Sequence, residues 1–124
     1  MISETNTEKT KKLIKKSKAP IIIKSQSPEY NRKILEYGHF DILLLDITKG
    51  RDKIKYLDTG INHVLAKIAA KNKVTIAIDL EDIRKADKKT KAIALARLDE
   101  LTKTCKKAKC KLQILNTENQ NLFI

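Results

Sequence analysis

The segment Asp58–Leu80 constrains the fold of this chain more than any other, because it predicts a helix that leads directly into a buried strand. The apolar residues of its first half recur at intervals of three and four, as on one face of an amphipathic helix, and they are Ile61, Val64, Leu65, Ile68 and Ala69. Asp58 or Thr59 can cap the first turn, and Asn72 is placed to end the last one. Residues 74–78, Val-Thr-Ile-Ala-Ile, are too apolar for a strand with one wet face, and they predict a strand of a parallel sheet covered by helices.

The alternation of helices and strands continues on both sides of this segment. Ser27 and Pro28 are typical of the cap and first residue of a helix, and Gly38 of a helix end. The predicted strands are Ile21–Ser25, Asp41–Ile47, Val74–Leu80 and Leu112–Asn116, and the predicted helices lie near Glu29–Tyr37, Ile61–Asn72 and Lys88–Lys109. The third helix has a narrow apolar seam formed by Ala94, Leu98, Leu101, Cys105 and Ala108. This order of elements indicates one α/β domain over residues 20–124, built from parallel βαβ units with right-handed crossovers.

Residues 1–19 differ from the rest because they are polar and rich in lysine. Only Leu13 and Ile14 could anchor a helix there, so we expect a basic arm or a short frayed helix. The stretch has no apolar h-region and therefore does not predict a secretory signal. With two cysteines in a chain that shows no export signal, we expect a reducing, cytoplasmic compartment and no disulfide.

The charge of the chain points to a polyanionic partner. The sequence contains 27 Lys and Arg residues against 15 Asp and Glu residues, which gives a net charge of +12. Such an excess on a small domain is typical of proteins that bind nucleic acid or an anionic membrane. The longest apolar run is Ile42–Leu45 and there is no Trp, so neither a spanning segment nor a membrane-surface helix is predicted. We therefore expect a nucleic-acid partner and no membrane.

The polar side of the helix in the first segment is the first candidate contact surface. His63, Lys67 and Lys71 are four residues apart and lie along one edge of that helix, and Asn62 lies near its first backbone N–H groups. An ordinary solvated helix face is the alternative interpretation. The arginines can grip phosphate in a fork, and Arg97 is the weakest candidate among them. The few scattered aromatic residues do not predict base stacking, so we expect recognition of backbone and shape.

Several of these residues belong to segments that resemble a known family. Residues 60–69, Gly-Ile-Asn-His-Val-Leu-Ala-Lys-Ile-Ala, followed by residues 74–78 and Leu80, resemble the core motif of archaeal ribonuclease P protein component three, a family shared with a eukaryotic nuclear ribonuclease P subunit. Asn31-Arg32-Lys33 with residues 41–43, and Gly50-Arg51-Asp52, resemble the helix-then-strand segment of that family and its basic loop. Residues 94–97 resemble its long helix. The resemblance extends over residues 20–115, and residues 60–80 are its specific part.

The resemblance implies a (β/α)8-like barrel. Such barrels usually have about 200 residues or more, and this chain has 124. We therefore expect an incomplete or minimised TIM-like barrel with parallel strands. The chain is either a shortened family member or part of a barrel whose open edges a partner covers.

The resemblance also implies a function, that of a protein subunit of ribonuclease P, the endoribonuclease that removes the 5′ leader from precursor tRNA. In that enzyme the RNA performs the chemistry with Mg²⁺, so we expect the protein to bind no cofactor and to supply no catalytic residue. The implied partners are ribonuclease P RNA, precursor tRNA and other protein subunits, including a second small subunit. We expect positive side chains to reduce the repulsion between RNA helices. The predicted RNA-binding residues are Arg32, Arg51, Asn62, His63, Lys67, Lys71, Lys73 and Arg84.

Two other functions remain open from the sequence. Asp46 and Asp79 end two predicted strands, where they could bind Mg²⁺ in a small metal-dependent hydrolase. Alternatively, they cap the following loops or pair with lysines. A general basic RNA-binding module is the second alternative. A zinc site formed by Cys105 and Cys110 with His39 and His63 has weak support, and buried structural thiols are favoured instead.

Overall fold

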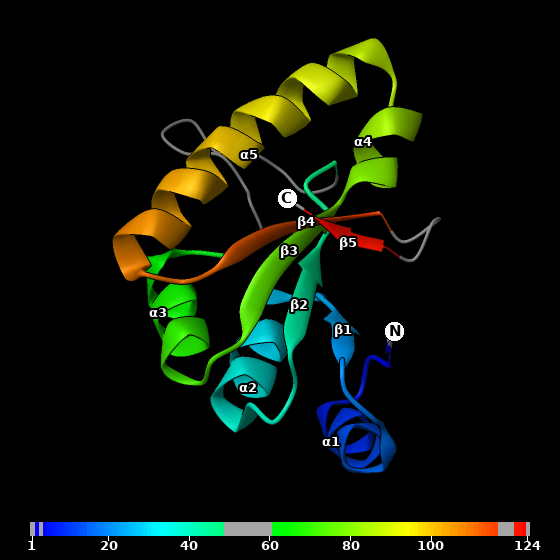
Figure 1. The fold of residues 1–124 in the computed structure, drawn as a ribbon, viewed down its shortest axis with the longest axis vertical. Coiled ribbons are helices and arrows are strands. Elements are labelled where there is room, and N and C mark those ends of the chain that lie inside the picture. Colours follow the sequence, from blue (N-terminus) through cyan, green and yellow to red (C-terminus); the bar gives the residue numbers. More distant parts are fainter. Residues whose placement is uncertain (1, 3, 49–60, 117–120, 124) are drawn as a thin grey trace.

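Helices and strands alternate along the computed structural model, which describes residues 2, 4–48, 61–116 and 121–123 (Figure 1). The elements are α1 Thr7–Lys16, β1 Ile22–Lys24, α2 Pro28–Tyr37, β2 Ile42–Leu45, α3 His63–Lys71, β3 Thr75–Asp79, α4 Leu80–Lys85, α5 Lys88–Ala108, β4 Leu112–Asn116 and β5 Asn121–Phe123. All four predicted strands and all three predicted helices are confirmed, within a few residues at each end. The structure also contains helix α4 and strand β5, which the sequence did not predict. Helix α1 corresponds to the short helix that was one of the two forms expected for residues 1–19.

The strands form one sheet in the order β1-β2-β3-β4-β5. The first four strands run parallel, with Ile23 opposite Leu43, Leu43 opposite Ile76, and Ile76 opposite Leu112. Strand β5 pairs antiparallel with β4. The chain therefore has the expected α/β fold with a parallel sheet, and strands that are consecutive in the sequence are neighbours in the sheet.

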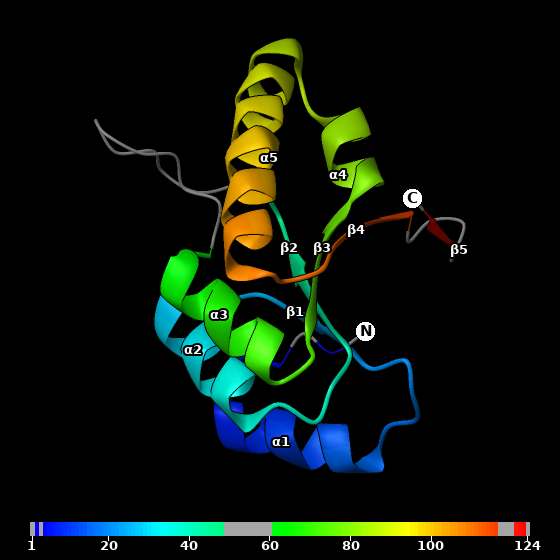
Figure 2. The same ribbon diagram turned by 60° about the vertical axis from the view of Figure 1, so that its left-hand side comes forward.

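The main core lies between one face of the sheet and the helices. Figure 2 shows α2, α3 and α5 on the same side of the strands. Ile23, Leu43 and Ile76 point into this core and are fully buried, as are Leu35 of α2 and Leu101 of α5. A second, smaller apolar cluster occupies the other face of the sheet, where the buried residues are Ile42, Leu44, Ala77 and Leu115. Burial on both faces explains why these strands are apolar at consecutive positions.

The start of α3 differs from the prediction. Its N-cap is Asn62, whose side-chain oxygen accepts a hydrogen bond of 2.9 Å from the backbone N–H of Leu65. The prediction that Asp58 or Thr59 caps this helix is therefore wrong, and both residues lie outside the described part of the chain. The buried residues of the helix are Leu65, Ala66 and Ala69, whereas Val64, which the spacing placed on the buried face, is 55% exposed.

The N-terminal residues pack onto the domain through α1. Thr10 and Ile14 are buried, and the Thr10 hydroxyl lies 2.8 Å from the hydroxyl of Tyr30 in α2. Ile2 forms a bridge with Ile23 at the edge of the sheet. Ile14 thus anchors α1, as expected, whereas Leu13 is 41% exposed.

Arg97 has a structural position in α5. Its side chain is buried, and Nη1 donates a hydrogen bond of 2.9 Å to the backbone carbonyl of Ile47, which follows β2. This arginine, the weakest RNA-binding candidate in the sequence, connects the long helix to the sheet. None of the helices in the described residues combines the length and the apolar character that crossing a membrane requires.

Candidate nucleic-acid interface

The predicted basic stripe is present on α3. Lys67 and Lys71 are exposed, and His63 occupies the first helical position one turn before Lys67. Because Leu65, Ala66 and Ala69 bury the opposite side of the helix, the stripe must face away from the core. The helix therefore presents two lysine charges and one imidazole along a single edge.

His63 is only partly accessible within this stripe. The residue is half-buried, and its Nδ1 atom is shielded from solvent without a hydrogen-bond partner in the described part of the chain. An RNA contact by His63 would have to use the exposed part of the ring.

Arg32 and Asn62 lie together at the N-terminal ends of α2 and α3. Both line an open groove of about 280 Å³, and the other residues of its lining are Pro28, Glu29, Val64 and Leu65. Arg32 Nε is 2.9 Å from Glu36 Oε1, but both side chains are more than half exposed, so this pair contributes only about 0.3–0.5 kcal/mol. The remaining N–H groups of the guanidinium can still bind another anion. The groove is adjacent to the basic stripe, because Asn62 lines the groove and His63, the first residue of the stripe, follows it in the sequence.

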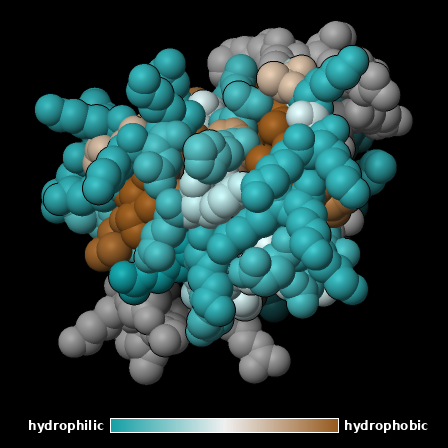
Figure 3. All heavy atoms as spheres, turned by 90° about the horizontal axis from the view of Figure 1, so that it is seen from below, coloured by the Kyte–Doolittle hydropathy of each residue, from teal (hydrophilic) through white to brown (hydrophobic). Residues whose placement is uncertain are grey.

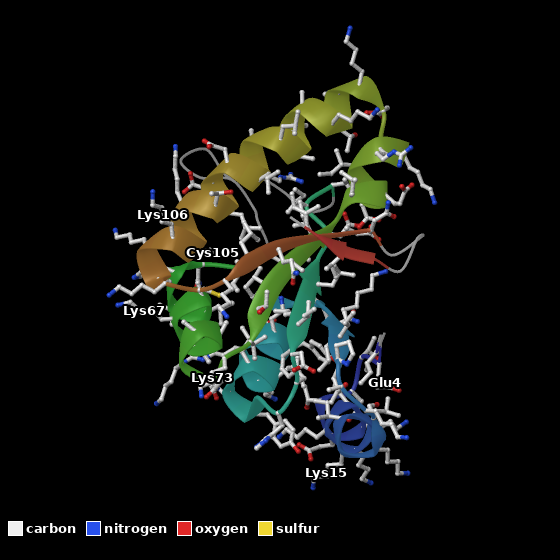
Figure 4. All side chains as sticks on the ribbon, in the orientation of Figure 1. Glu4, Lys15, Lys67, Lys73, Cys105 and Lys106 are labelled. Atoms are coloured by element: carbon white, nitrogen blue, oxygen red, sulfur yellow. The ribbon has the colours of Figure 1, made fainter. Side chains whose placement is uncertain are left out.

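Lys73 follows the end of α3 and is exposed. Its backbone has a φ of 58°, in the left-handed region that favours glycine. Figure 4 shows Lys67 and Lys73 on the same side of the molecule as Lys106 of α5. Lys73 therefore extends the basic surface of α3 toward the start of β3.

Two predicted residues do not join this surface. Arg84 lies on α4, where its Nη1 atom is 2.9 Å from Glu81 Oε1, and both views of the fold place α4 away from α3. Arg51 lies outside the described residues. The structure therefore places Arg32 and Asn62 in one groove, and it places His63, Lys67, Lys71 and Lys73 along α3 and just after it. Arg84 is separate from both sets.

The carboxylates considered for a metal site act as caps. Asp46 Oδ1 accepts hydrogen bonds from the backbone N–H and the hydroxyl of Thr48, and Asp79 Oδ1 accepts a bond of 3.0 Å from the backbone N–H of Glu81. In the ranges that the structure describes, no group of three or more His, Cys, Asp or Glu side chains could hold a metal ion. The capping role that the sequence allowed for both residues is thus the one observed.

Cys105 and Cys110 are buried free thiols, as expected. The hydrogen bond between the two thiols, together with burial, raises the pKa of Cys105. A raised pKa keeps the thiol protonated and lowers its reactivity. Both cysteines pack at the junction of α5 and β4.

The structure adds basic residues that the sequence did not suggest. Helix α5 packs against α3, so the lysines at its C-terminal end lie beside the stripe, and they are Lys106, Lys107, Lys109 and Lys111. The signal in the sequence is the run Lys-Lys-Ala-Lys-Cys-Lys at residues 106–111. Only the packing of two helices far apart in the sequence shows that this run extends the same surface.

Comparison with known proteins gives an informative similarity of fold. The sequence matches no protein-family model, and no curated protein is significantly similar to it. The fold is similar to that of a protein chain in the cryo-EM structure of archaeal ribonuclease P with mature tRNA, with a TM-score of 0.74 and 25% sequence identity. This chain resembles a protein of archaeal ribonuclease P. The similarity covers 93% of this chain and 48% of the other, so this chain spans about half the length of the protein it matches. The resemblance to ribonuclease P that residues 60–80 indicated is confirmed.

Proposed function

We propose that this chain is a protein subunit of ribonuclease P and helps the RNA of that enzyme to remove the 5′ leader from precursor tRNA. The observation that carries the proposal is the similarity of fold, over 93% of the chain, to a protein chain of archaeal ribonuclease P bound to mature tRNA. The net charge of +12 supports it, because a small domain with this excess attracts RNA.

The proposed mechanism is neutralisation of charge. RNA helices that pack closely bring phosphates together, and fixed lysine side chains reduce their repulsion while releasing counterions. Lys67, Lys71 and Lys73 supply such charges on α3 and just after it, and Arg32 adds a forked donor at the groove. In this proposal the chemistry belongs to the RNA and its Mg²⁺ ions, and the chain itself orients and binds.

We further propose that the fold is half of a β/α barrel. Parallel strands in sequential order, with their helices on one face, are the arrangement found in such barrels. Among the described strands, β1 and β5 end the sheet, and the bridge from Ile2 covers only part of the β1 edge. Open strand edges favour pairing with another chain. A second small subunit of the enzyme is the partner that we propose for these edges.

Reconstitution tests this function. The protein is mixed with the ribonuclease P RNA of its own organism and with candidate partner subunits, and cleavage of precursor tRNA is measured as the Mg²⁺ concentration is varied. We expect the protein to lower the Mg²⁺ concentration needed for cleavage, because bound lysines replace part of the screening by metal ions. The double variant Lys67→Glu/Lys71→Glu should lose most of this effect.

Two outcomes would contradict the proposal. One is the absence of stimulation at every Mg²⁺ concentration. The other is hydrolysis by the purified protein without any RNA, abolished in Asp46→Asn, which would favour a metal-dependent hydrolase.

A further inference from the structure

Helices α3 and α5 end in the same way. After α3, the backbone N–H of Val74 donates to the carbonyl of Ala69 over 2.8 Å, and that of Lys73 donates to Ala70 over 3.2 Å. After α5, the N–H of Cys110 donates to Cys105 over 2.8 Å, and that of Lys109 donates to Lys106 over 3.2 Å. This pair of bonds defines the Schellman motif, in which the residue after the last helical turn adopts a left-handed conformation.

The left-handed residue is a lysine in both motifs. Lys73 has a φ of 58° and Lys109 a φ of 60°, where glycine is the usual residue because it has no Cβ. Both side chains are exposed, and neither forms an ion pair with any of the described residues. Lys71 and Lys106 place positive charge in the last turns of the same two helices, so Lys73 and Lys109 add to a charge that is already there.

The two turns are neighbours in space. Strands β3 and β4 are adjacent and parallel, and the backbone N–H of Ile76 donates to the carbonyl of Lys111 over 2.9 Å. The Sγ atom of Cys110 lies 3.7 Å from the carbonyl oxygen of Val74. Since Lys73 and Lys109 directly precede these two contacting residues, both left-handed lysines lie at the edge where β3 and β4 begin.

Further lysines surround this pair. All are exposed, and we call the whole set the lysine edge, which consists of Lys71, Lys73, Lys106, Lys107, Lys109 and Lys111. Figure 4 shows Lys73 and Lys106 on the same side of the molecule as Lys67, and Lys15 of α1 lies elsewhere. Figure 3 views the side on which α3 ends and β3 begins, and its surface is mostly hydrophilic.

We propose that the lysine edge binds the phosphate backbone of folded RNA, and that it continues the basic stripe of α3 from the C-terminal end of that helix, away from the groove that contains Arg32 and Asn62. The proposal rests on the function proposed above and names the surface that performs it. The lysine edge consists of lysine side chains, which offer point charges without the fork of a guanidinium. Such a surface contacts phosphates regardless of sequence and loses affinity steeply as the salt concentration rises.

The experiment removes charge without disturbing the turns. Asparagine tolerates the left-handed conformation, so Lys73→Asn/Lys109→Asn removes two charges and keeps the backbone. Lys73→Arg/Lys109→Arg retains both charges. The matched control Lys12→Gln/Lys15→Gln removes two exposed lysines of α1. The full-length protein and each variant are titrated against the ribonuclease P RNA of the same organism at several salt concentrations, and thermal unfolding checks that the variants are folded.

We expect the asparagine pair to weaken binding by about tenfold or more. The plot of log K against log salt should also become less steep, by about two in the magnitude of its slope, since two phosphate contacts are lost. The arginine pair should bind like the wild type, and the α1 pair should lose clearly less. Equal losses from the asparagine and α1 pairs, or no loss from either, would overturn the lysine edge while leaving the proposed function intact. If the wild-type protein does not bind this RNA at all, the proposed function and the lysine edge both fail.

Discussion

The side chain of Asn72, at the end of α3, donates a hydrogen bond of 2.6 Å to the backbone carbonyl of Leu35 in α2. A longer bond of 3.4 Å reaches the carbonyl of Glu36. Gly38, which ends α2 with a φ of 68°, packs against the same asparagine, because a Cβ added there would lie 3.4 Å from Asn72 Cβ. One side chain thus connects the ends of the two helices whose first turns form the groove of Arg32 and Asn62.

Removal of this connection should destabilise the fold. In Asn72→Ala the last carbonyls of α2 lose a donor at a partly buried site, and we expect the free energy of unfolding to fall by about 1–2 kcal/mol. Urea unfolding measures the loss. The control Thr102→Ala removes an exposed side chain that bonds only within α5, and it should change stability by no more than about 0.5 kcal/mol. Equal effects of the two substitutions would show that the bond between α2 and α3 contributes little.

Stability should decrease at high pH through Tyr30. Burial raises the pKa of its hydroxyl, against a smaller lowering by the hydrogen bond with Thr10. In the unfolded chain the hydroxyl loses its proton near pH 10, whereas the folded chain retains it, so the free energy of unfolding falls as the pH rises above about 10. Urea unfolding from pH 8 to pH 11 should show a weaker decline in Tyr30→Phe, which is expected to be about 1 kcal/mol less stable at pH 8 because the bond to Thr10 is lost. Parallel declines in the two proteins would argue against this assignment.

Glycine at the left-handed positions should stabilise the protein. In Lys73→Gly or Lys109→Gly the steric cost of a Cβ at positive φ disappears, and we expect each substitution to raise the free energy of unfolding by up to about 1 kcal/mol. Lys106→Gly is the matched control, because the same change inside α5 should lower stability by about 1 kcal/mol. A loss of stability in all three variants would mean that the lysine side chains stabilise these turns.

Charge reversal on α3 should weaken RNA binding, and the affinity that remains should depend less steeply on the salt concentration. Lys67→Glu/Lys71→Glu replaces two exposed cations by anions on one helix edge, and we expect affinity for ribonuclease P RNA to fall by more than about tenfold at moderate salt. The same reversal on α1, in Lys12→Glu/Lys15→Glu, changes the net charge equally at another place. A filter-binding titration compares the two variants. If their losses are the same, the total charge of the protein determines binding and the position of the stripe does not.

Much of the fold could be predicted because its signals are local. The spacing of Leu65 and Ala69 and the apolar run of β3 each lie within a few residues, and both gave the correct element. The start of α3 was placed too early because several residues before it could cap a helix, and the hydrogen bond from Leu65 to Asn62 decides between them. Strand β5 and helix α4 are too short for a periodic pattern, and they escaped prediction for that reason.

The candidate interface was predictable only where it lies on one helix. His63, Lys67 and Lys71 share an edge because four residues make about one helical turn, and the sequence alone determines that relationship. Whether Arg84 joins that edge, and whether Lys109 lies beside Lys73, depends on how α4 and α5 pack against the rest of the domain. The amino-acid sequence therefore determined the three main helices, the four parallel strands and the basic stripe, since each follows from the pattern within one element. Only the tertiary structure decided which charges form a common surface, because contacts between residues distant in the sequence come from packing and leave no periodic signal.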